Sequence, residues 1–267
     1  MSLDIKVAFI GCGNMGGALA LSAAKSGCKL MLADPDSAKS GLLAQMTGGI
    51  AASNDECAAK ADYIFMAVKP QIIGAVLKAM APTLAARTDR FVIVSMAAGV
   101  EIDTIHAHLG FTCPTVRIMP NTPASIGAGV ILYCNKDITE AEESAFCTLM
   151  QNAGVLDSIP EKLIDSGSAL SGCGPAFVYQ FIEALADGAV DAGLPRDKAL
   201  MYAEHTVAGA ALLALQSGEH PGKLKDAVCS PGGSTIEGVR ALEAGAFRSS
   251  VMEAVIASYN RTKELGK

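Results

Sequence analysis

Residues 7–17 read V-A-F-I-G-C-G-N-M-G-G, and this stretch decides the fold. Residues 7–10 form a short apolar run, which is typical of a strand buried on both faces of a parallel sheet. Gly11, Gly13 and Gly16 follow in the spacing G-x-G-x-x-G, and alanine and leucine continue as good helix formers. Strand, glycine turn and helix therefore come in the order that a dinucleotide site requires.

Each glycine of this turn has a predicted role. Gly11 makes the tight turn, Gly13 lets a pyrophosphate approach the backbone, and Gly16 lets the helix pack against the strand. The free N–H groups and the positive dipole end of the helix would then hold the phosphates. The alternative is a glycine-rich turn of an α/β fold that binds no cofactor.

The composition limits the possible partners. The chain has 267 residues, a net charge of −6 and a pI near 5.2, which argues against nucleic acid or an anionic membrane as its main partner. Hydrophobic residues make up 51% and charged residues 18%, so the chain can bury a sizeable core together with subunit contacts. The most apolar long stretch, residues 206–216, is too short to span a bilayer.

The cysteines and histidines predict free thiols and no metal site. The eight cysteines are scattered without C-x-x-C pairs, which favours a reducing cytosol. His106 and His108 are two residues apart on a short predicted helix, so they do not share a face. Residues 1–6 lead directly into the first strand without the pattern of a signal peptide, and a cytoplasmic protein is therefore expected.

Strands and helices alternate through the first part of the chain. This order predicts an α/β fold with a doubly wound, mostly parallel sheet. From Pro160 onward helices dominate, so the sequence predicts a dinucleotide-binding domain over residues 1–160 and an all-α domain over residues 161–267. Helices are expected over residues 71–80 and 139–152, and strands over residues 7–10, 29–33, 62–68, 91–96, 114–118, 129–134 and 155–159.

Polar and small residues follow these strands, where an open α/β sheet places its ligand. Asp34 lies where an acid contacts the adenosine ribose, which favours NAD because a carboxylate repels the 2′-phosphate of NADP, although Lys39 could still serve a phosphate. Asp34 as a helix cap is the alternative. Asn54 either caps a helix or touches the ribose, and Lys69 is either a ligand contact or a solvated lysine. The small residues 97–99 let a flat ring approach the backbone.

The second part of the chain is predicted to be helical and to contact another subunit. Residues 168–174 form a small-residue linker, after which Pro175 starts a helix that ends near Asp191. A further helix covers residues 195–217, and its latter part, residues 207–215, is apolar nearly all round. Such a helix is buried on every side, so we expect a partner subunit to cover it. The alternative is the central helix of a monomeric bundle.

A second glycine turn lies within residues 225–240, which read K-D-A-V-C-S-P-G-G-S-T-I-E-G-V-R. S-P-G-G at residues 230–233 excludes regular helix, and Ser234 and Thr235 start the next helix. Backbone N–H groups at such a start can receive a carboxylate, and the Thr235 hydroxyl can both donate and accept a hydrogen bond. The alternative is an ordinary interhelical loop with serine and threonine capping.

With both turns in view, the chain strongly resembles the pyrroline-5-carboxylate reductase family over nearly its whole length. The most specific motif is S-P-G-G-S-T at residues 230–235, followed by L-E-A-G-A-F-R at residues 242–248. The spacing within residues 245–247 departs mildly from the family's pattern. The other matching stretches are A-V-K-P at residues 67–70, S-M-A-A-G at residues 95–99, Arg117 with P-N-T-P at residues 120–123, and S-G-C-G-P-A-F at residues 171–177.

The resemblance implies a fold, a reaction and a set of site residues. It implies a Rossmann domain, a helical domain that forms a homodimer, and a ring of five such dimers. The implied reaction is the reduction of the C=N bond of 1-pyrroline-5-carboxylate by NADPH or NADH to give L-proline. Substrate contacts are Val228, Gly233, Ser234 and Thr235. Cofactor contacts are Gly11, Cys12, Gly13, Asn14, Met15, Gly16, Asn54, Ala67, Val68, Lys69, Pro70, Met96, Ala97 and Ala98, to which the strand spacing adds Asp34.

Thr235 is the candidate catalytic residue, because its hydroxyl can bond and orient the ring nitrogen of the substrate. The nicotinamide supplies the hydride, so the protein contributes mainly position and electrostatics, and we predict no strong general acid. A β-hydroxyacid dehydrogenase is an alternative, but that family places a catalytic lysine in the helix that residues 174–191 would form, and these residues contain none. A non-catalytic NAD(P)-binding module is the other alternative.

Overall fold

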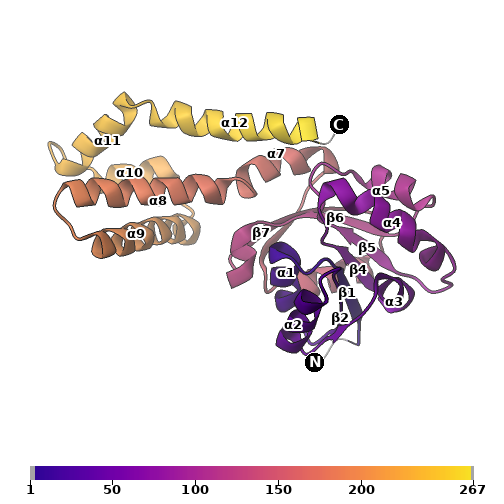
Figure 1. Ribbon diagram of the computed structural model, residues 1–267. Coiled ribbons are helices and arrows are strands. Elements are labelled where there is room, and N and C mark those ends of the chain that lie inside the picture. The colour runs from indigo at the N-terminus through magenta and orange to yellow at the C-terminus, as the bar shows by residue number, and fades with distance from the viewer. Residues whose placement is uncertain (1–3, 266–267) are drawn as a thin grey trace. The chain divides into compact units, whose positions relative to one another are not determined.

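The computed structural model describes residues 4–265 and divides the chain into two compact units. The first unit extends to Cys173 and includes the end of the chain from Ser258 onward, and the second unit covers Gly174–Ala257. Each unit is described by itself below. Figure 1 shows the sheet with its helices in the first unit and helices alone in the second.

The first unit is built on an eight-stranded sheet in the order β3-β2-β1-β4-β5-β6-β7-β8. All neighbouring strands are parallel except β6 and β7, which confirms the predicted doubly wound, mostly parallel sheet. The order reverses between β1 and β4, the point where such sheets bind ligands. The strands are β1 Lys6–Ile10, β2 Lys29–Ala33, β3 Ile50–Ala51, β4 Tyr63–Met66, β5 Val92–Ser95, β6 Thr115–Met119, β7 Gly129–Lys136 and β8 Gly154–Ser158.

Helices cover both faces of this sheet because its strands are apolar on both sides. Three helices, α1, α2 and α6, pack on one face, and α3, α4 and α5 pack on the other. The helices of the unit are α1 Asn14–Ala24, α2 Ser37–Thr47, α3 Asn54–Lys60, α4 Pro70–Ala85, α5 Ile102–Leu109, α6 Glu140–Met150 and α7 Glu161–Ser171, with a 3-10 turn η1 at Thr122–Ile126.

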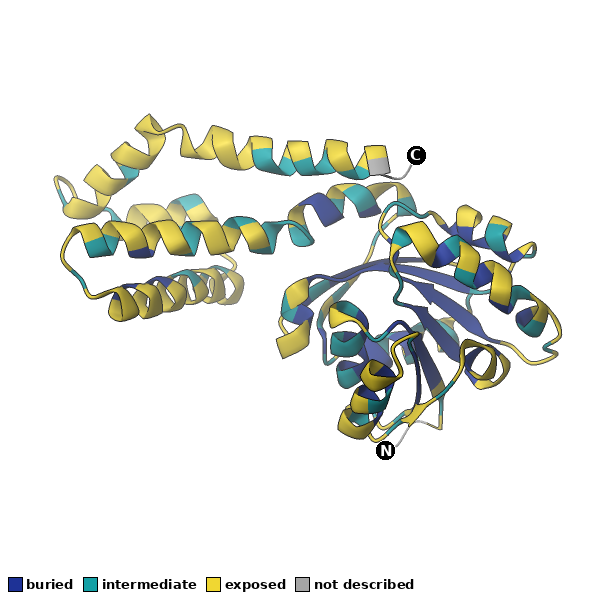
Figure 2. Ribbon diagram, in the orientation of Figure 1, coloured by how far each residue is buried: buried dark blue, intermediate teal, exposed yellow. Residues whose placement is uncertain are grey.

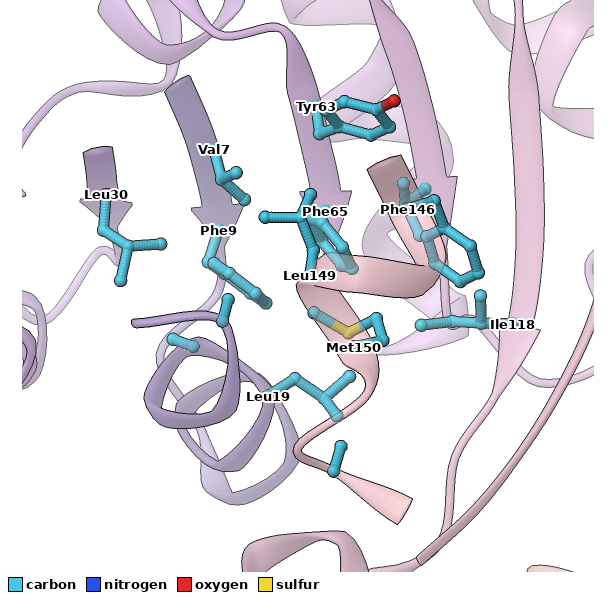
Figure 3. Close-up of a cluster of buried hydrophobic side chains, with 14 of the residues drawn as sticks. Val7, Phe9, Leu19, Leu30, Tyr63, Phe65, Ile118, Phe146, Leu149 and Met150 are labelled. Atoms are coloured by element: carbon cyan, nitrogen blue, oxygen red, sulfur yellow. The ribbon is translucent and has the colours of Figure 1, made fainter. Parts of the chain in front are cut away.

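The core on the first face is centred on stacked phenylalanines. The rings of Phe9 and Phe65, on neighbouring strands, lie 4.5 Å apart. Leu19 of α1 and Phe146 and Met150 of α6 pack into the same cluster (Figure 3). Each such side chain contributes about 1.5–3 kcal/mol on full burial, so this layer fixes the position of α1 against the sheet.

The second unit consists of helices only. Two glycines with positive φ follow its first two helices. Gly193 lies two residues after the end of α8, and Gly218 is the C-cap of α9. Ala186, Ala199 and Ala203 form the buried contact between these two helices. Much of the unit is exposed within the single chain (Figure 2). The helices are α8 Gly174–Asp191, α9 Arg196–Ser217, α10 Pro221–Val228, α11 Ser234–Ala244 and α12 Phe247–Leu265, the last of which continues into the first unit.

The predicted linker over residues 168–174 is wrong in its first part. Residues 168–171 continue α7, and α8 begins at Gly174. Ser168 and Ala169 are buried in α7, and a Cβ on the preceding Gly167 would lie 2.4 Å from Leu132 Cδ1 of β7. Since α7 packs on β7 within the first unit, the boundary between residues 160 and 161 stays a prediction. Among residues 4–265, no helix is long and apolar enough to cross a membrane.

Candidate active site

The first glycine turn brings β1, α1 and β4 into close contact. Gly11 has a φ of +105°, which favours glycine, and a Cβ there would lie 2.5 Å from the carbonyl oxygen of Ala67. A Cβ on Gly16 would lie 2.3 Å from the carbonyl oxygen of Gly11. Side chains at these two positions would push α1 away from the sheet, so the turn requires the glycines for the reasons predicted.

Gly13 leaves room above the start of α1. It is the N-cap of the helix, and a Cβ built on it would meet no described atom within 4 Å. The first turn, Asn14 to Gly16, is uncharged, so its N–H groups and the helix dipole favour an anion. The open space next to these donors can hold a pyrophosphate, so the residues of this turn fit a dinucleotide cofactor.

The ends of four parallel strands converge at this turn. The Gly11 N–H donates to Ala33 O at 2.7 Å, and the Ala67 N–H donates to Ile10 O at 2.8 Å. The Met96 N–H donates to Met66 O at 3.4 Å. Residues that follow β1, β2, β4 and β5 therefore lie along one edge of the sheet, as the sequence predicts for the cofactor-contacting segments.

Asp34 lies at this edge and is not a helix cap. Its carboxylate accepts hydrogen bonds from Cys12 N at 2.8 Å and from Asp36 N at 2.9 Å. Asp36 is the N-cap of α2 and accepts from Ala38 N. The capping alternative for Asp34 is therefore wrong, and its carboxylate is fixed beside the glycine turn.

Asn54 is not a cap either. Ser53 is the N-cap of α3, where it exchanges hydrogen bonds with Glu56 in a capping box. Asn54 is the first residue of the helix and is exposed. The signal for Ser53 was present in the sequence, because S-x-x-E is the pattern of a capping box. Contact with the ribose stays a prediction for Asn54.

Lys69 and Pro70 begin helix α4 at the same edge. Lys69 is the N-cap and is exposed, while Pro70 occupies the first turn, where its missing N–H costs nothing. The helix extends to Ala85 and is therefore longer than the predicted 71–80.

Cys12 sits inside the glycine turn as a neutral thiol. Burial raises its pKa to about 11, and the charge of Asp34 adds to the shift. Below pH 9 the thiol therefore keeps its proton, so Cys12 is not activated as a nucleophile.

The second glycine turn has a comparable construction within its own unit. Gly232 has a φ of +68°, and the Gly233 N–H donates to Ser230 O at 3.0 Å. A Cβ on Gly233 would lie 2.4 Å from Ser230 Oγ, which can rotate away, and 3.2 Å from Ser230 O, so the left-handed backbone at Gly232 is the stronger requirement for glycine in this turn. Gly233 is the N-cap of α11, and Thr235 in its first turn is exposed.

The comparisons with known proteins agree with both turns. The family model described as pyrroline-5-carboxylate reductase dimerisation matches residues 161–265, and one described as NADP oxidoreductase, coenzyme F420-dependent, matches residues 6–99. The pyrroline-5-carboxylate reductases of Pisum sativum and Escherichia coli are each 38% identical to the chain, over 99% of it and over 97% and 100% of their own lengths. The chain belongs to the pyrroline-5-carboxylate reductase family.

A solved structure of a family member matches the fold along the whole chain. The pyrroline carboxylate reductase of Plasmodium falciparum, crystallised with NADP bound, has a TM-score of 0.89 at 33% identity and covers 100% of both chains. Helix α8, where the sequence analysis placed the catalytic lysine of a β-hydroxyacid dehydrogenase, contains no lysine. The first helix after the sheet is α7, however, and it contains Lys162.

Two residues of the first unit were not predicted as functional, although they shape this edge. Arg117 is fully buried on β6 and forms ion pairs with Glu161 and Asp165 of α7. Asn121 connects Ser171 O to Val130 N through its side chain. An arginine within an apolar strand was the available signal for Arg117, but its partners lie too far along the chain to be read from spacing.

The described residues contain no cluster of three potential metal ligands. His106 is instead a buried core residue, with Nε2 3.0 Å from both Cys113 O and Thr115 Oγ1. This contact gives His106 a structural role in the core.

Proposed function

We propose that this protein reduces 1-pyrroline-5-carboxylate to L-proline with NAD(P)H, the last step of proline synthesis. The main support for the proposal is the second glycine turn at the start of α11, together with the similarity of the whole chain to reductases of this name. A dinucleotide-binding fold alone would leave this second anion-binding turn without a role.

The proposed cofactor contacts are the sequence-predicted residues at the sheet edge. The N–H groups of the first turn of α1 would hold the pyrophosphate, and the carboxylate of Asp34 would face the adenosine ribose. Met96, Ala97 and Ala98 would lie along the nicotinamide, which supplies a hydride when the cofactor is bound. The solved relative, which was crystallised with NADP bound, supports a nicotinamide dinucleotide as the cofactor.

The proposed substrate contacts are Val228, Gly233, Ser234 and Thr235. The substrate carries a carboxylate, and the main-chain N–H groups at the start of α11 can bind it without a buried lysine. Thr235 would hydrogen-bond the ring nitrogen and orient the C=N bond. An imine that enters protonated needs no acid from the protein, so Thr235 acts by position.

The proposed assembly is a homodimer formed by the helices of the second unit, and the finer proposal is a ring of five dimers. Leu212, Leu213 and Leu215 of α9 are 54%, 56% and 80% exposed in the single chain. Exposed apolar side chains at this density mark a contact with another protein surface. The family model described as pyrroline-5-carboxylate reductase dimerisation, which matches residues 161–265, supports the same assignment. We also propose a cytoplasmic location, based on the free cysteines.

The test of the proposed reaction is an absorbance assay of NAD(P)H consumption with 1-pyrroline-5-carboxylate. We expect NAD(P)H consumption with this substrate and L-proline as the product, and no NAD(P)H formation when a β-hydroxyacid is supplied with NAD(P)+. Oxidation of a β-hydroxyacid instead would favour the dehydrogenase alternative. NAD(P)H binding without any turnover would favour the non-catalytic module.

A further inference from the structure

The segment 96–101, between β5 and α5, is held at both ends by side chains. It contains three of the proposed cofactor contacts. At its start, the Ala97 N–H donates to Ser95 Oγ at 3.4 Å. At its end, the Ile102 N–H donates to Glu161 Oε1 at 2.8 Å. Glu161 is the first residue of α7, so a distant helix fixes where the segment ends.

Glu161 takes the place of a local cap for α5. The N-cap residue of this helix is Glu101, and in the described structure its side chain makes no capping bond. Ile102 is buried, and a buried N–H at a helix start needs an acceptor. A carboxylate is also favoured there by the helix dipole. The bond from Glu161 therefore sets the start of α5.

Arg117 keeps Glu161 in this position. Its side chain is 1% exposed, with Nη1 3.3 Å from the same Oε1 atom and Nη2 2.8 Å from Asp165 Oδ1. The strand register places Arg117 directly beside Ser95, whose hydroxyl holds the start of the segment. An ion-pair cluster around a buried arginine contributes little net stability, so its fixed geometry is its main effect.

We propose that Glu161 is a positioning residue for the nicotinamide cofactor and that Arg117 orients it for this role. The inference rests on the proposed function, which places residues 96–98 of this segment along the nicotinamide. Because the segment is already ordered, cofactor binding does not incur the entropy cost of ordering it, and the affinity for the cofactor is higher. Loss of the Glu161 bond should therefore weaken NAD(P)H binding and leave substrate binding unchanged.

Three substitutions at Glu161 separate the effect of its side-chain length from the effect of its charge. One oxygen, Oε1, receives both the Ile102 N–H and Arg117, so Glu161→Gln retains the acceptor, whereas Glu161→Asp keeps the charge on a shorter side chain. Glu161→Ala removes both. Glu140→Ala is the matched control, because Glu140 is the exposed first residue of α6.

We expect the Kd for NADH, measured by fluorescence titration of the full-length protein, to rise about tenfold in E161A and E161D, the effect of one hydrogen bond to a charged group. E161Q and E140A should stay within about twofold of wild type. The KM for 1-pyrroline-5-carboxylate at saturating NADH should not change. Hydrogen exchange in residues 96–102 should be faster in E161A and E161D only.

Wild-type NADH affinity in E161A or E161D would overturn the inference. Weak binding in E161Q with normal binding in E161D would also overturn it, since the charge near Arg117 would then matter and the bond to Ile102 would not. If E161A does not fold, the comparison of E161D with E161Q decides. A wild-type protein without NAD(P)H-dependent turnover would refute the proposed function instead.

Discussion

Asp34 is fixed by backbone donors and lies in a negative region. Asp36 lies two residues further along the chain, and Lys39 Nζ is 3.7 Å from Asp36 Oδ2. We expect Asp34→Asn to lower the ratio of the KM for NADPH to the KM for NADH about tenfold, because the amide keeps an acceptor for Cys12 N without repelling a 2′-phosphate. Asp157→Asn, at an exposed position on β8, is the control for steady-state kinetics with both cofactors. An unchanged ratio in D34N would show that Asp34 does not face the ribose.

Thr235 acts by orientation if the imine enters protonated. Thr235→Ala should then lower kcat/KM by about 1–3 kcal/mol, the effect of one lost hydrogen bond, and leave the shape of the pH profile unchanged. Thr235→Ser should keep most of the activity. Thr88→Ala, at an exposed loop position in the first unit, is the control. Complete loss of turnover in T235A at every pH would contradict a purely orienting role.

At the scale of helices and strands, apolar runs were sufficient to predict most of the sheet. The seven predicted strands are present, and all except β8 are short runs that are mostly buried on both faces. In β8 no residue is buried, and Val155 is 66% exposed. The edge strand β3, with the two exposed residues Ile50 and Ala51, has no such pattern and was not predicted. The antiparallel direction of β7 was also not predictable from its composition, because an apolar run does not encode direction.

Small residues were ambiguous in the sequence for a physical reason. They occur both in flexible linkers and where helices approach a strand closely, and residues 168–171 belong to the second case as the end of α7. The two glycine turns were predictable because each needs glycine at fixed spacing. The hydrogen bond from the Ile102 N–H to Glu161 was not predictable, because the two residues are 59 positions apart.

Neighbouring glycines of α1 provide a matched pair of substitutions. Gly16→Ala should destabilise the protein by about 1–3 kcal/mol, because the new Cβ would lie 2.3 Å from Gly11 O and 2.8 Å from Ala67 Cβ. Gly17→Ala should stabilise it by up to about 1 kcal/mol, since the Cβ there would meet Leu43 Cδ1 at 3.9 Å and alanine favours the helix. Urea unfolding of both variants measures the difference. Equal stabilities would show that α1 can move away from β4 without cost.

At the scale of the whole molecule, the two units differ in how many of their apolar side chains are exposed. In the first unit the apolar side chains form two large buried clusters on the two faces of the sheet. In the second unit only three small alanines, Ala186, Ala199 and Ala203, form a buried cluster. A groove of about 390 Å³ between α8, α11 and α12 is lined by apolar side chains that include Phe177, Phe181 and Phe247. This distribution agrees with the proposed dimer, in which another chain would cover the exposed apolar side chains of the second unit.

The proposed dimer predicts the effect of a charge on helix α9. Leu212→Glu should raise the dimer dissociation constant more than about tenfold, because a glutamate placed in an apolar interface loses its hydration without gaining a partner. Leu42→Glu is the control, since Leu42 is 60% exposed on α2 of the first unit against 54% for Leu212. Sedimentation velocity over a range of concentrations measures both. Dimers of equal stability in the two variants would remove α9 from the interface, and a wild-type monomer would leave its exposed leucines without a partner.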